Sequence, residues 1–184
     1  MPDTRTQRTD NAIKSAFLEL LEEKPLNSIS MAELAKRSGI SRSTLYAHFG
    51  NVSDVFNSLV TDFRRDIIGL RALLRCEECG KPGSKKPFCL ALRAAGPYQP
   101  LVMAPEFMPT FLEFVLEKSA GFDGFDALEP YRLPGLTEAQ AKTLFTFQMN
   151  GCYAAAMLGK EVVWSDHQKA IDQFIRGGLA ALRG

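Results

Sequence analysis

A short polar stretch, residues 41–48, carries side chains that can hydrogen-bond to another molecule. Arg42 presents its N–H donors in a planar fork, and two of them can bond in parallel to the edge of one guanine base. Hydroxyl groups both donate and accept, so they suit a wider choice of partner. The chemistry that this stretch predicts is recognition rather than bond making. Its other polar residues are Ser41, Ser43, Thr44, Tyr46 and His48.

Cysteine is the second residue type whose spacing could do chemistry. Cys76 and Cys79 form a C-x-x-C pair, Cys89 follows after nine further residues, and Cys152 lies far along the chain. Thiolates at such spacing can bind zinc or act as a redox switch. A structural zinc site usually takes four ligands at closer paired spacing, and the chain has only two histidines. We therefore expect ordinary reduced cysteines and no cofactor, and keep a thiol- or metal-sensing role as the alternative.

Enzyme motifs are absent from the sequence. It has no H-E-x-x-H, no G-x-S-x-G, no phosphate-binding P-loop and no dinucleotide-binding glycine fingerprint. The sequence therefore predicts a binding protein and not an enzyme.

The polar stretch needs elements to position it, and local signals predict them. Apolar residues recur at helical spacing over residues 9–23, and Pro25 stops that helix. Ser30 and Glu33 have the spacing of a capping box, which starts a short second helix at residue 31. Gly39 suits a left-handed turn after it, and Ser41 can cap a third helix that runs through residue 49. Two short helices joined by a tight glycine turn form the scaffold that lays a recognition helix in the major groove of DNA.

The remainder of the chain also has helical periodicity, with no useful length of strand-like alternation. Asn51 and Asp54 offer a cap for a fourth helix of roughly six turns, which includes Leu70 and Leu74. Loops rich in glycine are expected at residues 77–87 and 120–135. Further helices are predicted near residues 88–95, 105–119, 137–158 and 166–182.

Composition narrows the class of protein without naming a partner. The hydrophobic and charged fractions, 46% and 23%, are those of an ordinary globular chain. The net charge of +1 shows no basic excess, so the case for DNA rests on pattern. No stretch is long and apolar enough to cross a membrane, and the polar N-terminus has no signal-peptide pattern. These features predict a cytoplasmic protein.

Several features of the first 65 residues occur together at a defined spacing. They are Leu34, Ala35, Gly39, Ile40, the run Thr44-Leu45-Tyr46 and the pair His48-Phe49, followed by the capped start of a fourth helix. In this joint spacing the chain resembles the tetracycline-repressor (TetR) family of bacterial regulators. Beyond these residues the resemblance extends only to helical character and overall length.

The resemblance implies which side chains meet DNA. In such proteins the first turn of the recognition helix contacts base edges. The resemblance therefore implies that the residues in contact with bases here are Ser41, Arg42, Ser43 and Thr44. Tyr46 and His48 would then contact phosphates. The alternative for Tyr46 and His48 is packing against the first helix. The alternative for Arg42 is a solvated side chain that contacts no base. Family members often place a lysine near the start of the fourth helix, but Gly50 and Val52 are uncharged here, which puts that contact in doubt.

The second half of the chain would hold an effector pocket and a dimer interface, as the resemblance implies. Its last two helices would pair with those of a second copy, where Gly151 and Gly178 permit close approach. Large apolar side chains could line a pocket for a small molecule, although core packing is the commoner role of such residues. The candidate pocket residues are Phe107, Phe111, Phe114, Phe145, Met149 and Trp164.

Together these observations predict an all-α chain with a three-helix DNA-binding domain at residues 1–52, a connecting helix at 53–76 and a helical effector-binding and dimerisation domain at 77–184. The expected function is ligand-responsive regulation of transcription, as a homodimeric repressor on a palindromic operator in double-stranded DNA. A helical module that binds other proteins but not DNA is a further alternative.

Overall fold

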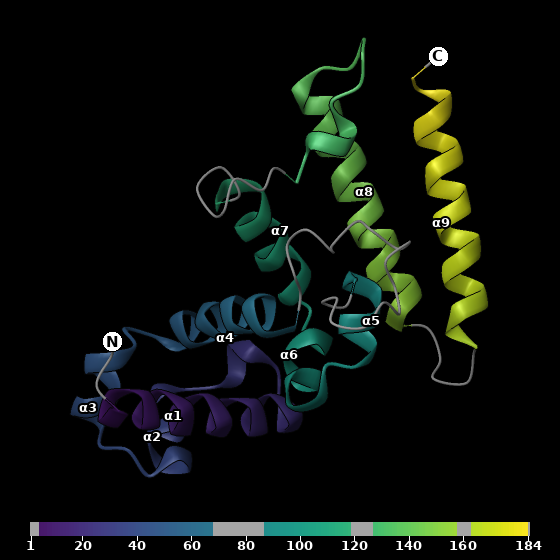
Figure 1. Cartoon of the computed structure of the whole chain (residues 1–184). Helices are drawn as coiled ribbons and strands as arrows, with labels where there is room; N and C mark the ends of the chain where they lie inside the picture. Colours follow the sequence, from purple (N-terminus) through teal and green to yellow (C-terminus); the bar gives the residue numbers. More distant parts are fainter. Residues whose placement is uncertain (1–3, 68–86, 119–126, 158–162, 184) are drawn as a thin grey trace. The chain divides into compact units, whose positions relative to one another are not determined.

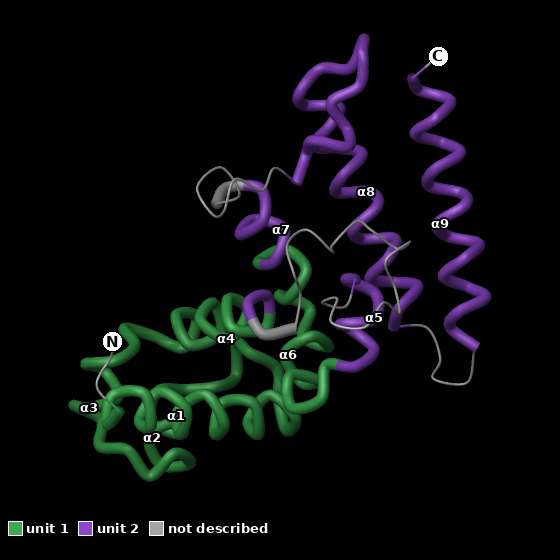
Figure 2. Tube along the Cα trace, in the orientation of Figure 1, with its two compact units in different colours: residues 1–63, 95–110 green, residues 64–94, 111–184 purple. Residues whose placement is uncertain are grey.

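The computed structural model describes residues 4–67, 87–118, 127–157 and 163–183. Within these ranges every regular element is a helix and none is a strand, which confirms the all-α prediction (Figure 1). The chain divides into two compact units, residues 1–63 with 95–110 and residues 64–94 with 111–184 (Figure 2). Among the helices so described, none is long and apolar enough to span a membrane.

Unit 1 is built on α1 (Thr4–Glu23), α2 (Met31–Ser38), α3 (Arg42–His48) and the first part of α4 (Val52–Ile67). The apolar stripe of α1 packs against α2 through Leu34 and Ala35, while α3 contributes one buried side chain, Leu45. The other buried residues of α1 and α4 in this core are Ile13, Ala16, Phe17, Leu20, Val55, Phe56, Leu59, Val60 and Phe63.

The ends of the first four helices follow the local signals in the sequence. α1 ends at Glu23, two residues before Pro25, although it begins five residues earlier than predicted. α2 begins at Met31 with the complete Ser30–Glu33 capping box. At the start of α4 the amide oxygen of Asn51 accepts from the Asp54 N–H at 3.0 Å, and the Asp54 carboxylate accepts from the Asn51 N–H at 3.1 Å. The predicted cap is therefore present, while Leu70 and Leu74 lie outside the described residues.

A short helix in unit 1 escaped prediction. α6 (Gln99–Met103) follows the 3-10 turn η4 (Gly96–Tyr98) and packs on α1. It was not among the predicted helices, and its Pro100 lies in the first turn, where a missing N–H costs no hydrogen bond. Tyr98 and Phe107 both meet the ring of Phe63 edge-on, with centroid distances of 5.6 and 5.5 Å. These aromatic contacts attach residues 95–110 to the core of unit 1.

Unit 2 contains α5 (Phe88–Arg93), most of α7 (Phe107–Lys118), the 3-10 turn η5 (Glu129–Tyr131), α8 (Glu138–Met157) and α9 (Trp164–Ala181). α5 packs on α8. Arg93 donates to the carbonyl of Ala156 at 3.2 Å and lies 4.8 Å from the centre of the Trp164 ring. This arginine therefore joins the end of α8 to the beginning of α9.

The turn between α2 and α3 depends on Gly39. Its φ of +69° lies in the left-handed region, as the sequence predicted, and a side chain in that region is strained even though the surrounding space is open. Ser41 then caps α3 two residues later. The direction of α3 is thus set within three residues.

We expect Gly39→Ala to lower the free energy of unfolding of unit 1 by about 1–2 kcal/mol, because alanine in the left-handed region crowds its own carbonyl. Gly39→Asn is the matched control, since asparagine tolerates this conformation better. Urea unfolding followed by circular dichroism measures both. Equal losses for the two variants would contradict the conformational explanation.

Candidate nucleic-acid interface

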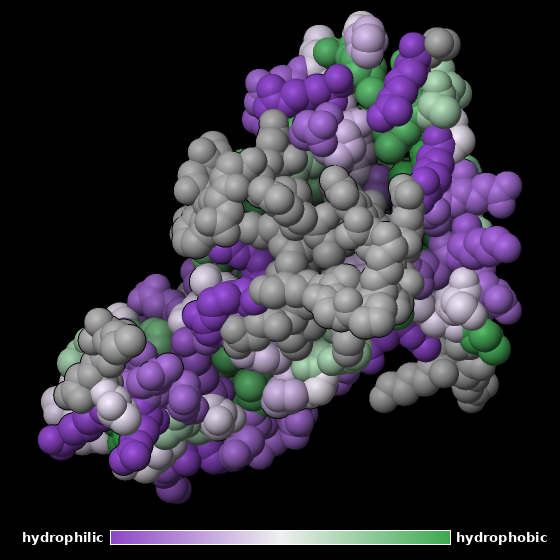
Figure 3. Space-filling view, viewed as in Figure 1, coloured by the Kyte–Doolittle hydropathy of each residue, from purple (hydrophilic) through white to green (hydrophobic). Residues whose placement is uncertain are grey.

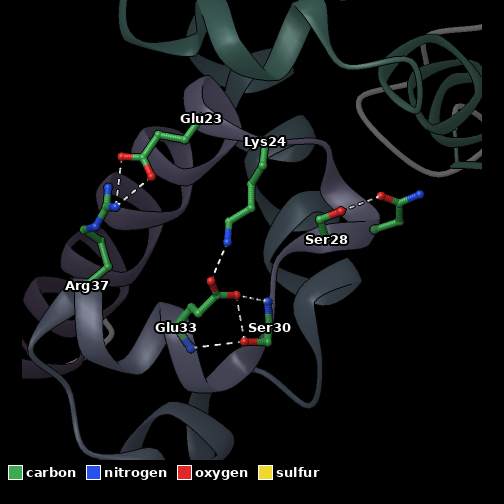
Figure 4. Close-up of polar contacts among 7 residues, drawn as sticks. Glu23, Lys24, Ser28, Ser30, Glu33 and Arg37 are labelled. Atoms are coloured by element: carbon green, nitrogen blue, oxygen red, sulfur yellow. Dashed lines mark hydrogen bonds and ion pairs between the residues drawn. The ribbon is translucent and has the colours of Figure 1, made fainter.

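Ion pairs of Arg37 and Lys24 join α2 to α1 and to the residue that follows α1 (Figure 4). The Arg37 guanidinium donates through Nη2 to both carboxylate oxygens of Glu23, each at 2.9 Å, and through Nη1 to Glu19 at 3.5 Å. The hydrogen bond with Glu23 raises the pKa of Arg37, and the same bond lowers the pKa of Glu23. The Arg37 side chain is therefore bound to carboxylates of α1, although Arg37 lies close to the predicted interface in sequence.

The ion pair of Lys24 reaches the capping box at the start of α2. Lys24 donates to Glu33, whose other carboxylate oxygen accepts from the Ser30 N–H at 3.1 Å and from the Ser30 hydroxyl at 2.8 Å (Figure 4). The hydrogen bond from Lys24, followed by those from Ser30, lowers the pKa of Glu33 to about 2. One carboxylate thus caps α2 and also ties it to the end of α1.

The first turn of α3 presents a group of exposed hydroxyls. The Ser41 oxygen accepts from the Thr44 N–H at 3.2 Å and lies 3.0 Å from the Ser43 hydroxyl and 2.8 Å from the Thr44 hydroxyl. Ser41 thus caps the helix, as predicted, while all three hydroxyls remain exposed. They can exchange hydrogen bonds with one another for bonds to an outside partner.

Arg42 and Tyr46 extend from the same short helix into solvent. Arg42 is exposed and has no side-chain partner among the described residues. Tyr46 is 55% exposed, which argues against its packing into the core of unit 1. Figure 3 shows a mostly hydrophilic surface over this end of unit 1, at the lower left. The structure therefore brings Ser41, Arg42, Ser43, Thr44 and Tyr46 together as an exposed polar surface on α3 and its cap, which we call the α3 surface.

His48 differs from the rest of the predicted set. Its side chain is only 16% exposed, and Nδ1 lies 2.5 Å from the Asp10 carboxylate of α1. Sequence reasoning missed Asp10, because the two residues are separated by 38 positions and no local pattern pairs them. The role of His48 at a phosphate stays a prediction, with the added finding that one ring nitrogen is already occupied.

The predicted pocket residues have mixed surroundings. Phe107 is buried in unit 1 beside Phe63, and Phe111 is buried in unit 2, where it stacks on Phe88 at a centroid distance of 4.9 Å. Phe145 and Met149 are buried in α8, while Phe114 and Trp164 are half-buried. One surface hollow of unit 2, about 370 Å³, is lined by other residues, which include Leu128, Arg132 and Ala141. The pocket assignment stays a prediction.

The cysteines that could act as a redox switch or bind a metal lie partly within the described residues. Cys76 and Cys79 lie outside the described residues, while Cys89 is buried in α5 and Cys152 is half-buried in α8. No group of three or more potential metal ligands occurs among the residues that the structure describes. Thiol or metal sensing by Cys76, Cys79 and Cys89 therefore stays untested.

The two short helices, their left-handed turn and the polar face of α3 define a helix-turn-helix protein. Residues 13–59 match the profile of the family described as bacterial regulatory proteins, tetR family. This match confirms the resemblance to that family for the N-terminal helix-turn-helix region.

Individual proteins are also similar to the chain. The uncharacterized HTH-type transcriptional regulator YxbF of Bacillus subtilis (strain 168) is 31% identical over 67 residues, which are 36% of this chain. The chain spans only 18% of the length of that relative. The crystal structure of the TetR family repressor AlkX from Dietzia sp. strain DQ12-45-1b, implicated in biodegradation of n-alkanes, matches with 18% identity and a TM-score of 0.44. That match covers 93% of this chain and 97% of AlkX.

The lowered pKa of Glu33 makes the α1–α2 connection sensitive to acid. A carboxylate whose pKa is about 2 in the folded chain, against an ordinary 4.5, stabilises the fold fully above pH 4.5 and loses this contribution as the pH falls toward 2. We expect the difference in urea midpoint between wild type and Glu33→Gln to be largest above pH 4.5 and to shrink below it.

Lys24→Met supplies the control for this prediction, because Lys24 is the largest cause of the shift. In that background the same Glu33→Gln comparison should show a weaker dependence on pH. A dependence that is unchanged would remove the Lys24 contact as its cause.

Proposed function

We propose that this protein is a transcriptional repressor that binds a palindromic operator in double-stranded DNA as a homodimer and responds to a small-molecule effector. One observation carries the proposal: a helix-turn-helix of the TetR family exposes the α3 surface with Arg42 unpaired among the described residues. DNA lies in the cytoplasm of a bacterium, so we propose that the protein works there.

The charges around α3 support a role for Arg42 in reading bases. Lys14, Lys24 and Arg37, all in unit 1, are engaged with carboxylates of the same unit. Arg42 has no such partner among the described residues, and its guanidinium can therefore turn fully to a guanine edge. The hydroxyls beside it and Tyr46 are placed to bond neighbouring bases or phosphates.

The homodimer is supported by the last helix. α9 has no buried residue over its 18 residues, and Phe174 on its apolar face is 73% exposed. Ile171, Ile175 and Leu182 lie on the same face at helical spacing. A second copy that covers this face would remove apolar area from water and would set two recognition helices on one duplex.

The effector would act on the helical second unit. Its buried aromatic residues suit a small, apolar molecule, and Phe111, Phe114, Phe145, Met149 and Trp164 are the candidates to meet it. α4 follows α3 after only three residues and buries its apolar face in unit 1, so a rotation of α4 would move α3. Spacing between the two recognition helices of the dimer would then change.

Selection of bound duplexes from a random pool tests the main proposal, since it needs no prior operator. We expect enrichment of a palindrome. Arg42→Ala should relax base preference at one position in each half-site, at a cost of about 1–3 kcal/mol. Arg42→Lys keeps the charge but loses the fork, so it should lose preference as well.

Lys36→Ala is the matched control, because it removes an exposed cation of α2 that lies off the α3 surface. We expect this variant to keep the wild-type base preference. Wild-type protein that enriches no sequence from the pool would refute the regulator proposal.

Sedimentation tests the dimer separately. Phe174→Glu places a charge on the exposed apolar face of α9 and should shift the protein toward a monomer. Gln173→Glu adds the same charge to an exposed position of the same helix, on its polar side, and should leave the dimer intact. A Phe174→Glu protein that still sediments as a dimer would place the interface elsewhere.

A further inference from the structure

The recognition helix is too short to hold its own shape. α3 has seven residues, whereas isolated helices in water are marginal below about 12–15 residues. Ser41 caps its beginning, and Leu45 is its only buried side chain among the described residues. The far end of α3 therefore depends on contacts with the rest of unit 1.

One polar contact joins that far end to another helix. His48 is the last residue of α3, and its Nδ1 lies 2.5 Å from the Asp10 carboxylate on α1. The side chains are 16% and 35% exposed, so solvent competes less with this bond than with one on an open surface. Within the described ranges, no other side-chain hydrogen bond links α3 to a different helix.

The chemistry of the pair fixes the histidine ring as well as the helix. An ionised carboxylate only accepts hydrogen bonds, so Nδ1 must carry the proton in this contact. A ring held at Nδ1 has a defined orientation, and its other nitrogen, Nε2, has no partner among the described residues. Asp10 therefore sets both the position of the last turn and the nitrogen that stays available.

We propose that Asp10 is a positioning residue for DNA binding: acting through His48, it holds α3 in the orientation in which the α3 surface meets a duplex. The inference rests on the proposed function, since it assigns a role within the same interface. Asp10 itself is not placed in contact with DNA. Its effect should appear in the recognition of a particular sequence, which requires a fixed helix, more than in general attraction to phosphates.

The test compares the Kd for the duplex selected by wild type with the Kd for a random duplex of equal length. Asp10→Leu removes the acceptor at similar size and should lower the specific-to-random ratio about tenfold, which corresponds to about 1.4 kcal/mol. Asp10→Asn keeps an oxygen that can accept from Nδ1–H, so it should recover part of the ratio. A merely structural role would lower the folded fraction and leave the ratio unchanged.

Asp62→Leu is the matched control. Asp62 forms an ion pair with Lys14 of α1 at the same distance, 2.5 Å, but from α4 instead of α3. This variant should lose stability and keep the specific-to-random ratio.

Two further measurements ask whether Asp10 acts through His48. In the His48→Ala background, Asp10→Leu should have no further effect on the ratio. The long-range 15N–1H spectrum of the two histidines, assigned with His167→Gln, should show His48 protonated at Nδ1 in wild type and lose that signature in Asp10→Leu.

The outcomes separate the two proposals. If wild type distinguishes the selected duplex and Asp10→Leu does so equally well, the role of Asp10 is overturned and the regulator proposal stands. An Asp10 effect that adds fully to that of His48→Ala also overturns it. If wild type distinguishes no duplex, both proposals fail.

Discussion

The left-handed turn at Gly39 is the constraint on which unit 1 depends. It lies between two short helices, each started by a serine cap, Ser30 before α2 and Ser41 before α3. Neither helix is long enough to be stable alone, so each needs its cap and its packing, which for α2 is on α1 and for α3 is on α2. Because the turn and the caps fix the backbone, few apolar side chains of α3 are needed for packing. Its remaining positions are free to carry polar groups.

Carboxylates shape the electrostatics of this unit as much as its cations do. Glu23 holds Arg37, and Glu33 holds Lys24, so these two cations are neutralised within the unit. Arg42, on α3, has no such partner among the described residues.

The sequence predicted those features whose causes are local. Pro25 ended α1, the Ser30–Glu33 and Asn51–Asp54 boxes started α2 and α4, and Gly39 marked the turn, because each signal acts within about four residues. Contacts between distant residues had no such signal. The Asp10–His48 pair was therefore not predicted, and neither was α6, which has only five residues and carries Pro100 in its first turn. The exposure of Tyr46 likewise depends on how α3 packs. Residue spacing alone did not decide whether Tyr46 packs against the first helix or faces a partner.

The contact between Arg93 and Trp164 gives the second unit an optical signal of its own. Trp164 is the sole tryptophan of the chain, and unit 1 contains none. A cation 4.8 Å from the ring centre and the half-buried position of the ring both influence indole emission, so a change at the α8–α9 junction alters the fluorescence. Excitation of the indole therefore reports on unit 2 alone. A loss of circular dichroism with no change in indole emission therefore identifies unfolding of unit 1 without any added label.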